Sequence, residues 1–153
     1  MYAAGMTMKE ENYQIFKDAF EKEVERTIHP DMLTPEIAVD AEIDFADITP
    51  KFIRILKQFE PYGPQNMTPV FLTKNIKDTG YGKPMGQEDE HLKLFVKQSL
   101  SLGTEGIAAI GFNLGNKIKL TTHQKSFQAL YCIDENEWNG KKSLQLRLRD
   151  IKE

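Results

Sequence analysis

Apolar and polar residues alternate along five short runs in the second part of the chain, which predicts five β-strands. The alternation is clearest in residues 91–97 and 143–151, where leucine or valine fills every second position and the positions between are mostly basic. Successive side chains of a strand point to opposite faces, so one face of each should be buried and the other exposed. The five runs are residues 70–76, 91–97, 106–112, 126–133 and 143–151.

Two helices are predicted before these strands. The first covers residues 10–27, where Tyr13, Phe16, Phe20 and Val24 recur at helical spacing. The second should begin where a threonine and a proline suit the N-cap and the first helical position. These two residues are Thr49 and Pro50, the apolar face that follows is Phe52, Ile55, Leu56 and Phe59, and Pro61 ends the helix.

Between the helices, residues 37–45 alternate apolar and acidic side chains, which predicts a half-exposed strand with an acidic face of Asp40, Glu42 and Asp44. After the second helix, residues 61–69 contain three prolines and a glycine and should form a loop of restricted conformation.

The strand pattern predicts a small barrel. Asn139 and Gly140 favour a two-residue hairpin turn, so the last two strands should pair. Residues 113–122 are long enough for the short helix that five-stranded oligonucleotide/oligosaccharide-binding (OB) barrels carry between their third and fourth strands. The expected fold class is therefore mainly β with flanking α-helices: an OB-like barrel of five strands preceded by two helices.

Charge is distributed unevenly along the chain. Residues 1–60 contain 13 acidic and 7 basic side chains, whereas residues 61–153 contain 10 acidic and 13 basic ones, so their net charges are −6 and +3. A basic barrel joined to an acidic segment is compatible with contacts to phosphates. The chain has no apolar run that suggests a membrane span or an export signal, and we expect a cytoplasmic protein. The single cysteine, Cys132, lies in an apolar run and is interpreted as a core residue.

The residues needed for catalysis are missing. The three histidines, His29, His91 and His123, lie in different segments without a second ligand at metal-binding spacing. No nucleophile motif, phosphate-binding loop or dinucleotide fingerprint is present. We therefore expect neither catalytic nor metal-ligating residues in this chain.

The loop before the barrel reads PYGPQNMTPVF at residues 61–71. It resembles the P-(F/Y)-G-x-x-N-x-x-P-x-F junction that precedes the barrel of RecJ exonucleases. Residues 91–94, 107–112 and 131–151 are similar to the family's second strand, third strand and closing hairpin, and residues 2–8 with the following helix resemble the end of its substrate-binding (DHHA1) domain. The resemblance covers nearly the whole chain, but the family's Asp-His-His and Gly-Gly-His motifs are absent.

The resemblance implies a C-terminal fragment of a RecJ-type protein. Residues 1–30 would be a remnant of the substrate-binding domain with a strand end and a helix, residues 31–69 a linker strand, helix and proline-rich junction, and residues 70–153 the OB-fold barrel. The parent would be a 5′-3′ exonuclease specific for single-stranded DNA that uses Mn²⁺ or Mg²⁺ in DNA repair and recombination. This part would bind DNA without catalysing its hydrolysis, and it would need no cofactor of its own.

A barrel of this type binds single strands through a basic groove and aromatic side chains on which bases stack. By alternation, the exposed faces of the second and fifth strands supply such groups. The candidate DNA-binding residues are Lys74, Tyr81, Lys83, Lys93, Phe95, Lys97, Arg147 and Arg149.

Two alternatives remain open at this stage. The barrel or the acidic face of residues 40–44 could dock a protein partner, such as a single-strand-binding protein or a helicase. The fragment could also be a structural clamp in the intact enzyme that has little affinity for DNA alone.

Overall fold

The computed structural model describes residues 4–98, 106–122, 125–138 and 140–153 and divides the chain into two compact units, Met1–Ile37 and Ala38–Glu153. In the first unit a 3-10 turn, Glu10–Asn12, leads into helix α1, Tyr13–Thr27, and a second turn covers Pro30–Leu33. The helix predicted for residues 10–27 is therefore confirmed. No helix of the described residues is long and apolar enough to cross a membrane.

The second unit contains seven strands and several short helices. The strands are β1 (Ala41–Glu42), β2 (Phe71–Asp78), β3 (Lys83–Met85), β4 (His91–Gln98), β5 (Ile107–Gly111), β6 (Phe127–Trp138) and β7 (Lys141–Lys152). The helices are α2 (Pro50–Leu56) and α3 (Ile118–Thr121), and 3-10 turns cover Phe45–Asp47, Lys57–Phe59 and Gly115–Lys117.

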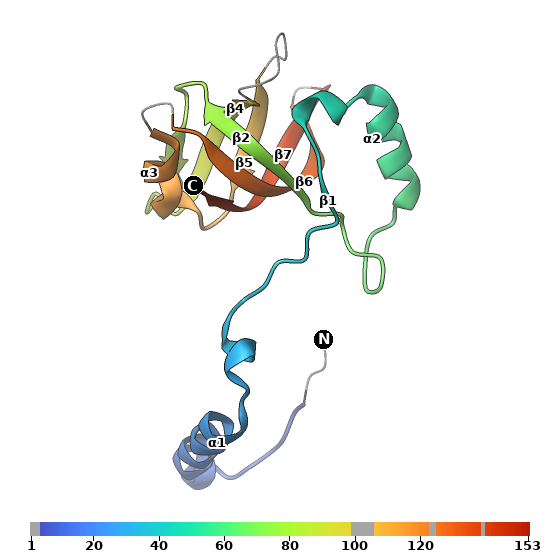
Figure 1. Cartoon of the computed structure of the whole chain (residues 1–153). Helices are drawn as coiled ribbons and strands as arrows, with labels where there is room; N and C mark the ends of the chain where they lie inside the picture. Colours follow the sequence, from blue (N-terminus) through green and yellow to red (C-terminus); the bar gives the residue numbers. More distant parts are fainter. Residues whose placement is uncertain (1–3, 99–105, 123–124, 139) are drawn as a thin grey trace. The chain divides into compact units, whose positions relative to one another are not determined.

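Five of the strands close into a ring (Figure 1). Their order is β2, β6, β7, β5 and β4, and β4 pairs back with β2. Within the ring only the β5–β7 pair is parallel. This is the strand order of an OB-like fold, so the predicted five strands and the pairing of the last two are confirmed. Asn139 of the predicted hairpin turn lies outside the described residues, and Gly140 has the positive φ, 73°, that such a turn favours.

The interior of the ring is apolar and follows the predicted alternation. On β4, Leu92, Leu94 and Val96 point inward and are buried, as are Leu146 and Leu148 of β7. The short helix expected between the third and fourth strands is present as Gly115–Lys117 and α3. Cys132, the only cysteine of the chain, is buried, as its apolar neighbours in the sequence predict.

Two irregularities change the alternation along the ring strands. In β2 the register with β6 shifts between Thr73 and Ile76, where Asn75 has a positive φ of 58°. This β-bulge adds one residue to the strand. As a result Lys74 and Lys77 both lie on the outer face, although they are three positions apart. The register of β6 and β7 also shifts, between Leu130 and Tyr131.

The strand predicted for residues 37–45 is wrong in its length. Only Ala41–Glu42 forms β1, which runs parallel to β2. The chain then turns at Phe45–Asp47, because the side chains of Asp44 and Asp47 form a reciprocal capping box with backbone N–H groups. Short polar side chains compete with strand pairing in this way, and the alternation contained no sign of the turn.

Helix α2 begins as predicted but buries a narrower face. The Thr49 hydroxyl accepts a hydrogen bond from the Phe52 amide, and Pro50 is the first helical residue. Phe52 and Leu56 pack against the core, whereas Ile55 and Phe59 are exposed, contrary to the prediction. The α-helix ends at Leu56 and continues as a 3-10 turn, whose tighter winding takes Phe59 away from the buried face.

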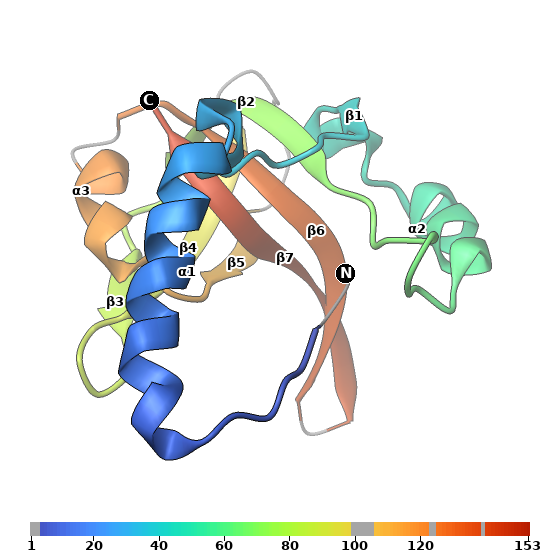
Figure 2. The same ribbon diagram turned by 90° about the horizontal axis from the view of Figure 1, so that it is seen from below.

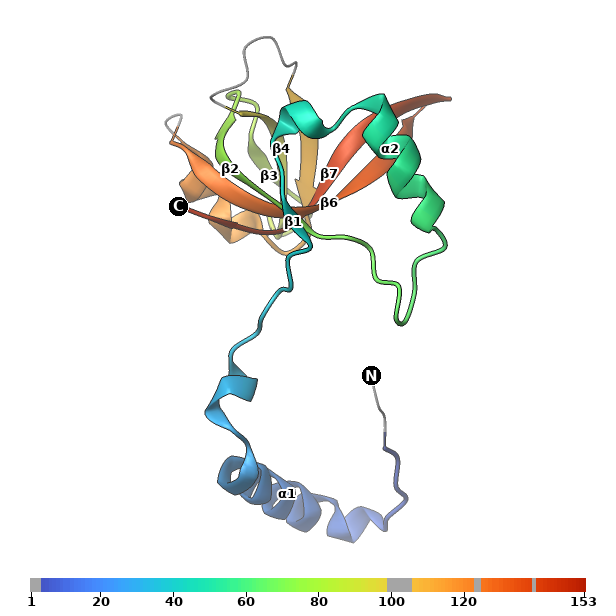
Figure 3. The same cartoon turned by 45° about the vertical axis from the view of Figure 1, so that its right-hand side comes forward.

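The β6–β7 hairpin and α2 lie side by side (Figure 3). The Lys57 ammonium and the Glu135 carboxylate are 2.6 Å apart across this contact. The same ion pair holds the pKa of Glu135 below its ordinary value. In the view from below, β6 and β7 are seen as a long two-stranded ribbon that extends beyond the other strands (Figure 2).

The junction at residues 61–66 is fixed by its own hydrogen bonds. Gly63 and Asn66 exchange backbone hydrogen bonds of 2.8 and 2.9 Å. The side-chain amide of Asn66 donates to the carbonyls of Phe59 and Pro61, and the Tyr62 hydroxyl donates to the Leu56 carbonyl. The tyrosine, glycine and asparagine of the junction motif therefore fix the junction against the end of α2.

Candidate nucleic-acid interface

Two lysines on the outer face of β4 each lie directly opposite a lysine of a neighbouring strand. Lys93 faces Lys83 of β3, and Lys97 faces Lys77 of β2. Like charges at directly opposite positions of a sheet are destabilising. An arrangement of this kind is favourable when an anion binds between the charges.

The same face continues across β5 to β7. Lys93 lies opposite Ile110 of β5, and Ile110 lies opposite Arg147 of β7. The Nε atom of Arg147 is buried and has no hydrogen-bond partner among the described residues. In that part of the chain, no ion pair involves Lys77, Lys83, Lys93, Lys97 or Arg147.

Exposed aromatic rings lie on or beside this basic face. Phe95 of β4 is 38% exposed and lies between Lys93 and Lys97 in the sequence of outward positions. Phe112, which directly follows β5, is 54% exposed. Tyr81 is 77% exposed in the turn between β2 and β3. The face thus combines cations with aromatic surfaces, the two components of a site for single-stranded nucleic acid.

The turn that carries Tyr81 is held by a buried carboxylate. One oxygen of Asp78 accepts hydrogen bonds from the amides of Gly80 and Gly82, at 2.7 and 2.9 Å, and the other accepts from the amide of Phe95 at 3.1 Å. A Cβ atom on Gly82 would lie 2.8 Å from the buried Leu94 side chain, so a larger residue there would displace that side chain. Asp78 therefore fixes the turn against β4.

The eight sequence-predicted residues do not all gather in one place. Pairing of β3, β4, β5 and β7 brings Lys83, Lys93, Phe95, Lys97 and Arg147 onto adjoining strands. The other three are not paired with these five residues across the strands. They are Lys74, Tyr81 and Arg149.

Lys74 is engaged elsewhere, because its ammonium lies 2.8 Å from the carboxylate of Glu42. Arg149 is exposed on β7, and its Nε donates to the sulfur of Cys132 at 3.4 Å. Tyr81 extends from the turn described above. All three positions are compatible with a contact to DNA. The charge of Lys74, however, is already neutralised by Glu42, so Lys74 would attract a phosphate less strongly.

Sequence reasoning missed Lys77 and Phe112. Lys77 was overlooked because strict alternation from Phe71 places it on the inner face, and only the bulge at Asn75 turns it outward. A lysine at an expected core position was the available signal for a bulge. Phe112 ends the run of residues 106–112 that predicts the third strand, whereas in the structure its ring is exposed just beyond the end of β5. The missed strand β3 is only three residues long and contains Pro84, which suits an edge strand.

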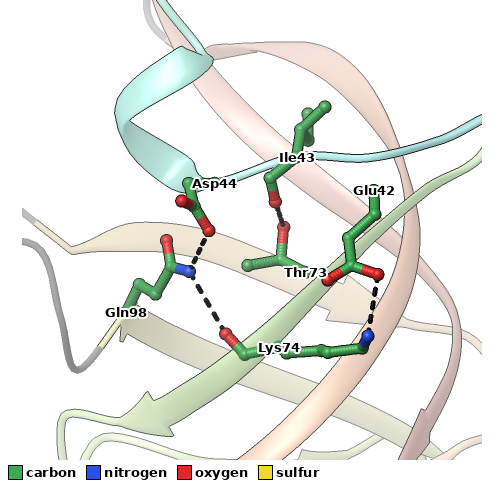
Figure 4. A network of polar contacts seen from close by, with 6 residues as sticks. All are labelled: Glu42, Ile43, Asp44, Thr73, Lys74 and Gln98. Atoms are coloured by element: carbon green, nitrogen blue, oxygen red, sulfur yellow. Dashed lines mark hydrogen bonds and ion pairs between the residues drawn. The ribbon is translucent and has the colours of Figure 1, made fainter.

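The acidic segment of residues 40–44 is bound to the ring by its own side chains (Figure 4). Asp40 accepts a hydrogen bond from the Val70 amide, and Glu42 pairs with Lys74. Asp44 accepts from the side-chain amide of Gln98 at 2.5 Å. These carboxylates therefore serve internal contacts, which disfavours the idea that they form a free acidic docking surface.

A buried polar chain crosses the core beneath this segment. The Thr73 hydroxyl donates to the Ile43 carbonyl at 2.7 Å, so it accepts from the Tyr131 hydroxyl at 2.6 Å. Burial raises the pKa of Tyr131 to about 12. Tyr131 remains protonated at neutral pH and has a structural role.

No group of three or more His, Cys, Asp or Glu side chains among the described residues could hold a metal ion. His123 lies outside those residues.

Comparison with known proteins gives consistent matches. The RecJ OB domain family matches residues 39–150. The single-stranded-DNA-specific exonuclease RecJ of Escherichia coli K12 is 25% identical over 152 residues, and that of Bacillus subtilis 168 is 25% identical over 150 residues. Each alignment covers 97% of this chain but only 25% and 18% of the respective relative.

Solved structures agree in fold. The crystal structure of RecJ in complex with Mn²⁺ from Thermus thermophilus superposes with a TM-score of 0.68 and 22% sequence identity, covering 97% of this chain and 20% of that one. The chain thus spans about a fifth to a quarter of the length of most of the proteins it matches.

Proposed function

The chain belongs to the RecJ OB domain family, and we propose that it is the single-stranded-DNA-binding, non-catalytic module of a single-strand-specific exonuclease. The observation that carries the proposal is that two lysines of β4 lie directly opposite lysines of neighbouring strands, Lys93 opposite Lys83 and Lys97 opposite Lys77. Each such pair costs folding free energy in the absence of an anion. A phosphate backbone would remove that cost on binding.

The position of this face supports the same proposal. OB-folds bind oligonucleotides on their second and third strands and on adjoining loops. In this ring those strands are β4 and β5, which carry Lys93, Phe95 and Lys97 and lead into Phe112. Phosphate contacts would provide most of the affinity, and stacking on the aromatic rings would favour single strands over duplex.

The activity of the intact protein is part of the proposal. By analogy with the exonucleases that it matches, the protein would degrade single-stranded DNA from the 5′ end, with Mn²⁺ or Mg²⁺ bound elsewhere, in DNA repair and recombination. This module would hold the strand.

A titration of labelled single-stranded DNA, followed by fluorescence anisotropy at several salt concentrations, tests the proposal. The variant Lys93→Ala/Lys97→Ala should bind more weakly, with a salt slope smaller by roughly one for each lost phosphate contact. The control variant Lys51→Ala/Lys152→Ala removes two exposed lysines elsewhere on the unit and should bind like the wild type. Duplex DNA should bind less well than single strands.

Two outcomes would contradict the proposal. One is no binding by the wild type at about 100 μM protein, the weak end of non-specific DNA binding; the module would then be a structural clamp or a site for a protein partner. The other is an equal loss of affinity in both double variants, because the β4 face would then have no special role.

A further inference from the structure

We infer that the single strand lies along β4 and that Phe112, held by His91, forms a second base-stacking site besides Phe95. This inference rests on the proposed DNA-binding function and adds the path of the strand. It depends on how the two rings are held, on their spacing, and on the charges between and beyond them.

Phe112 is an exposed ring that is fixed in place. Its centroid lies 5.1 Å from that of His91, with the two ring planes at 76°. The Nδ1 atom of His91 accepts a hydrogen bond of 3.3 Å from the amide of Asn113, whose φ is 57°. The Phe112 ring is therefore held by the His91 ring and by the backbone that follows it, yet 54% of Phe112 remains exposed. A ring that is ordered without being buried offers a prepared surface for a base.

Phe95 is held in a comparable way. A Cβ atom on Gly106 would lie 2.5 Å from the Phe95 ring, so the glycine leaves the space that the ring occupies. The backbone amide of Phe95 donates a hydrogen bond to the Asp78 carboxylate, and its carbonyl accepts one from the Thr79 hydroxyl. The ring thus packs on the residue that precedes β5, its backbone is held by the end of β2 and the turn that follows, and 38% of the residue is exposed.

The spacing of these groups suits an extended strand. The outward positions of β4 are His91, Lys93, Phe95 and Lys97, so aromatic rings alternate with cations. Positions two residues apart on a strand are about 6.6–6.8 Å apart, so Phe95 lies about 13 Å along β4 from His91, the residue whose ring contacts Phe112. A stacked strand rises about 3.4 Å per nucleotide, so the span corresponds to about four steps, with at most about three nucleotides between the two that stack on the rings.

Charge differs between the two ends of β4. The loop before His91 is acidic, with Glu88, Asp89 and Glu90, whereas the other end carries the pair of Lys77 and Lys97. Phosphates should therefore contact Lys93 and Lys97, and Phe112 should receive a base at the less basic end of the path.

The test compares Phe112→Leu with Phe59→Leu in anisotropy titrations against oligothymidylates of increasing length. Phe59 is a matched control because it is 57% exposed and lies on the 3-10 turn after α2. The variant Phe112→Leu should lose about fivefold or more in affinity, with an unchanged salt slope. For the wild type, affinity should increase with oligonucleotide length until both aromatic sites are occupied. For Phe112→Leu this increase should end at a shorter length, because one of the two stacking sites is lost.

Phe112→Tyr retains an aromatic ring and should bind with nearly wild-type affinity. The stacking assignment is overturned if Phe112→Leu keeps the affinity and length dependence of the wild type while Lys93→Ala/Lys97→Ala still binds weakly; the proposed function would then stand without this path. It is also overturned if Phe112→Tyr loses as much affinity as Phe112→Leu. Absence of any binding by the wild type would overturn both proposals.

Discussion

At the scale of single residues, the lysine pairs oppose folding and favour binding. Replacing Lys93 with glutamine removes its repulsion with Lys83 while keeping a long polar side chain on β4. We expect Lys93→Gln to raise the free energy of unfolding by roughly 0.2–1 kcal/mol at low salt and to lower the affinity for single-stranded DNA. The gain should shrink at high salt, because surface charges are then screened. Urea denaturation at two salt concentrations measures it.

The control for this prediction is Lys51→Gln, which changes an exposed lysine of α2, outside the sheet. If Lys93→Gln is only as stable as the wild type at low salt, the repulsion between Lys93 and Lys83 contributes nothing measurable to the free energy of unfolding. A variant with higher stability and unchanged affinity would show that the repulsion exists but has no relation to DNA.

Tyr131 gives the molecule a pH dependence in the alkaline range. Its pKa is raised by burial to about 12 in the folded protein, against about 10 in the unfolded chain. The contribution of protonated Tyr131 to the free energy of unfolding is therefore fully present below about pH 10. It is lost as the pH rises towards about 12, because over this range Tyr131 ionises in the unfolded chain but not in the folded protein. The loss should reach about 2–3 kcal/mol.

Tyr131→Phe removes the ionising group and should abolish that part of the pH dependence, while other tyrosines and lysines titrate in both proteins. Urea denaturation of the two proteins between about pH 10 and about pH 12 measures the difference. Parallel curves for wild type and variant would mean that Tyr131 ionises in the folded state as readily as in the unfolded one.

At the scale of elements, Gln98 joins the segment around Asp44 and Phe45, near the start of the second unit, to β4. Its carbonyl oxygen accepts from the Phe45 amide at 2.8 Å, and its amide donates to Asp44 and to the Lys74 carbonyl. Gln98→Leu would leave a buried backbone donor unpaired, which costs about 1–3 kcal/mol. The exposed Gln58→Leu is the control and should cost much less.

The measurement for Gln98→Leu is again chemical denaturation, supplemented by hydrogen exchange at Phe45. Exchange there should accelerate in the variant, because the amide loses its acceptor. If exchange at Phe45 stays slow while global stability falls, the cost comes from misfit of leucine in the core rather than from release of the segment.

Gln98 also shows what sequence could and could not predict about the elements. The ring strands were predictable because their apolar positions recur every second residue, and α2 was predictable because Thr49 and Pro50 mark its start. The turn at Phe45 and the bulge at Asn75 were not, because each depends on hydrogen bonds or register shifts that only the neighbouring strand supplies. The candidate site followed the same rule: Lys93 and Lys97 came from alternation, whereas Lys77 required the bulge.

At the scale of the whole molecule, the chain consists of two units, and every contact of the proposed interface lies within Ala38–Glu153. In the first unit α1 buries none of its residues, and an isolated helix of about this length is marginally stable in water. We therefore expect removal of residues 1–37 to leave the urea midpoint of the ring and its affinity for single-stranded DNA unchanged. A lower midpoint would mean that the ring depends on the first unit for stability. A normal midpoint with reduced affinity would mean instead that residues 1–37 contribute to the DNA-binding surface, and the path along β4 would then be only part of the site.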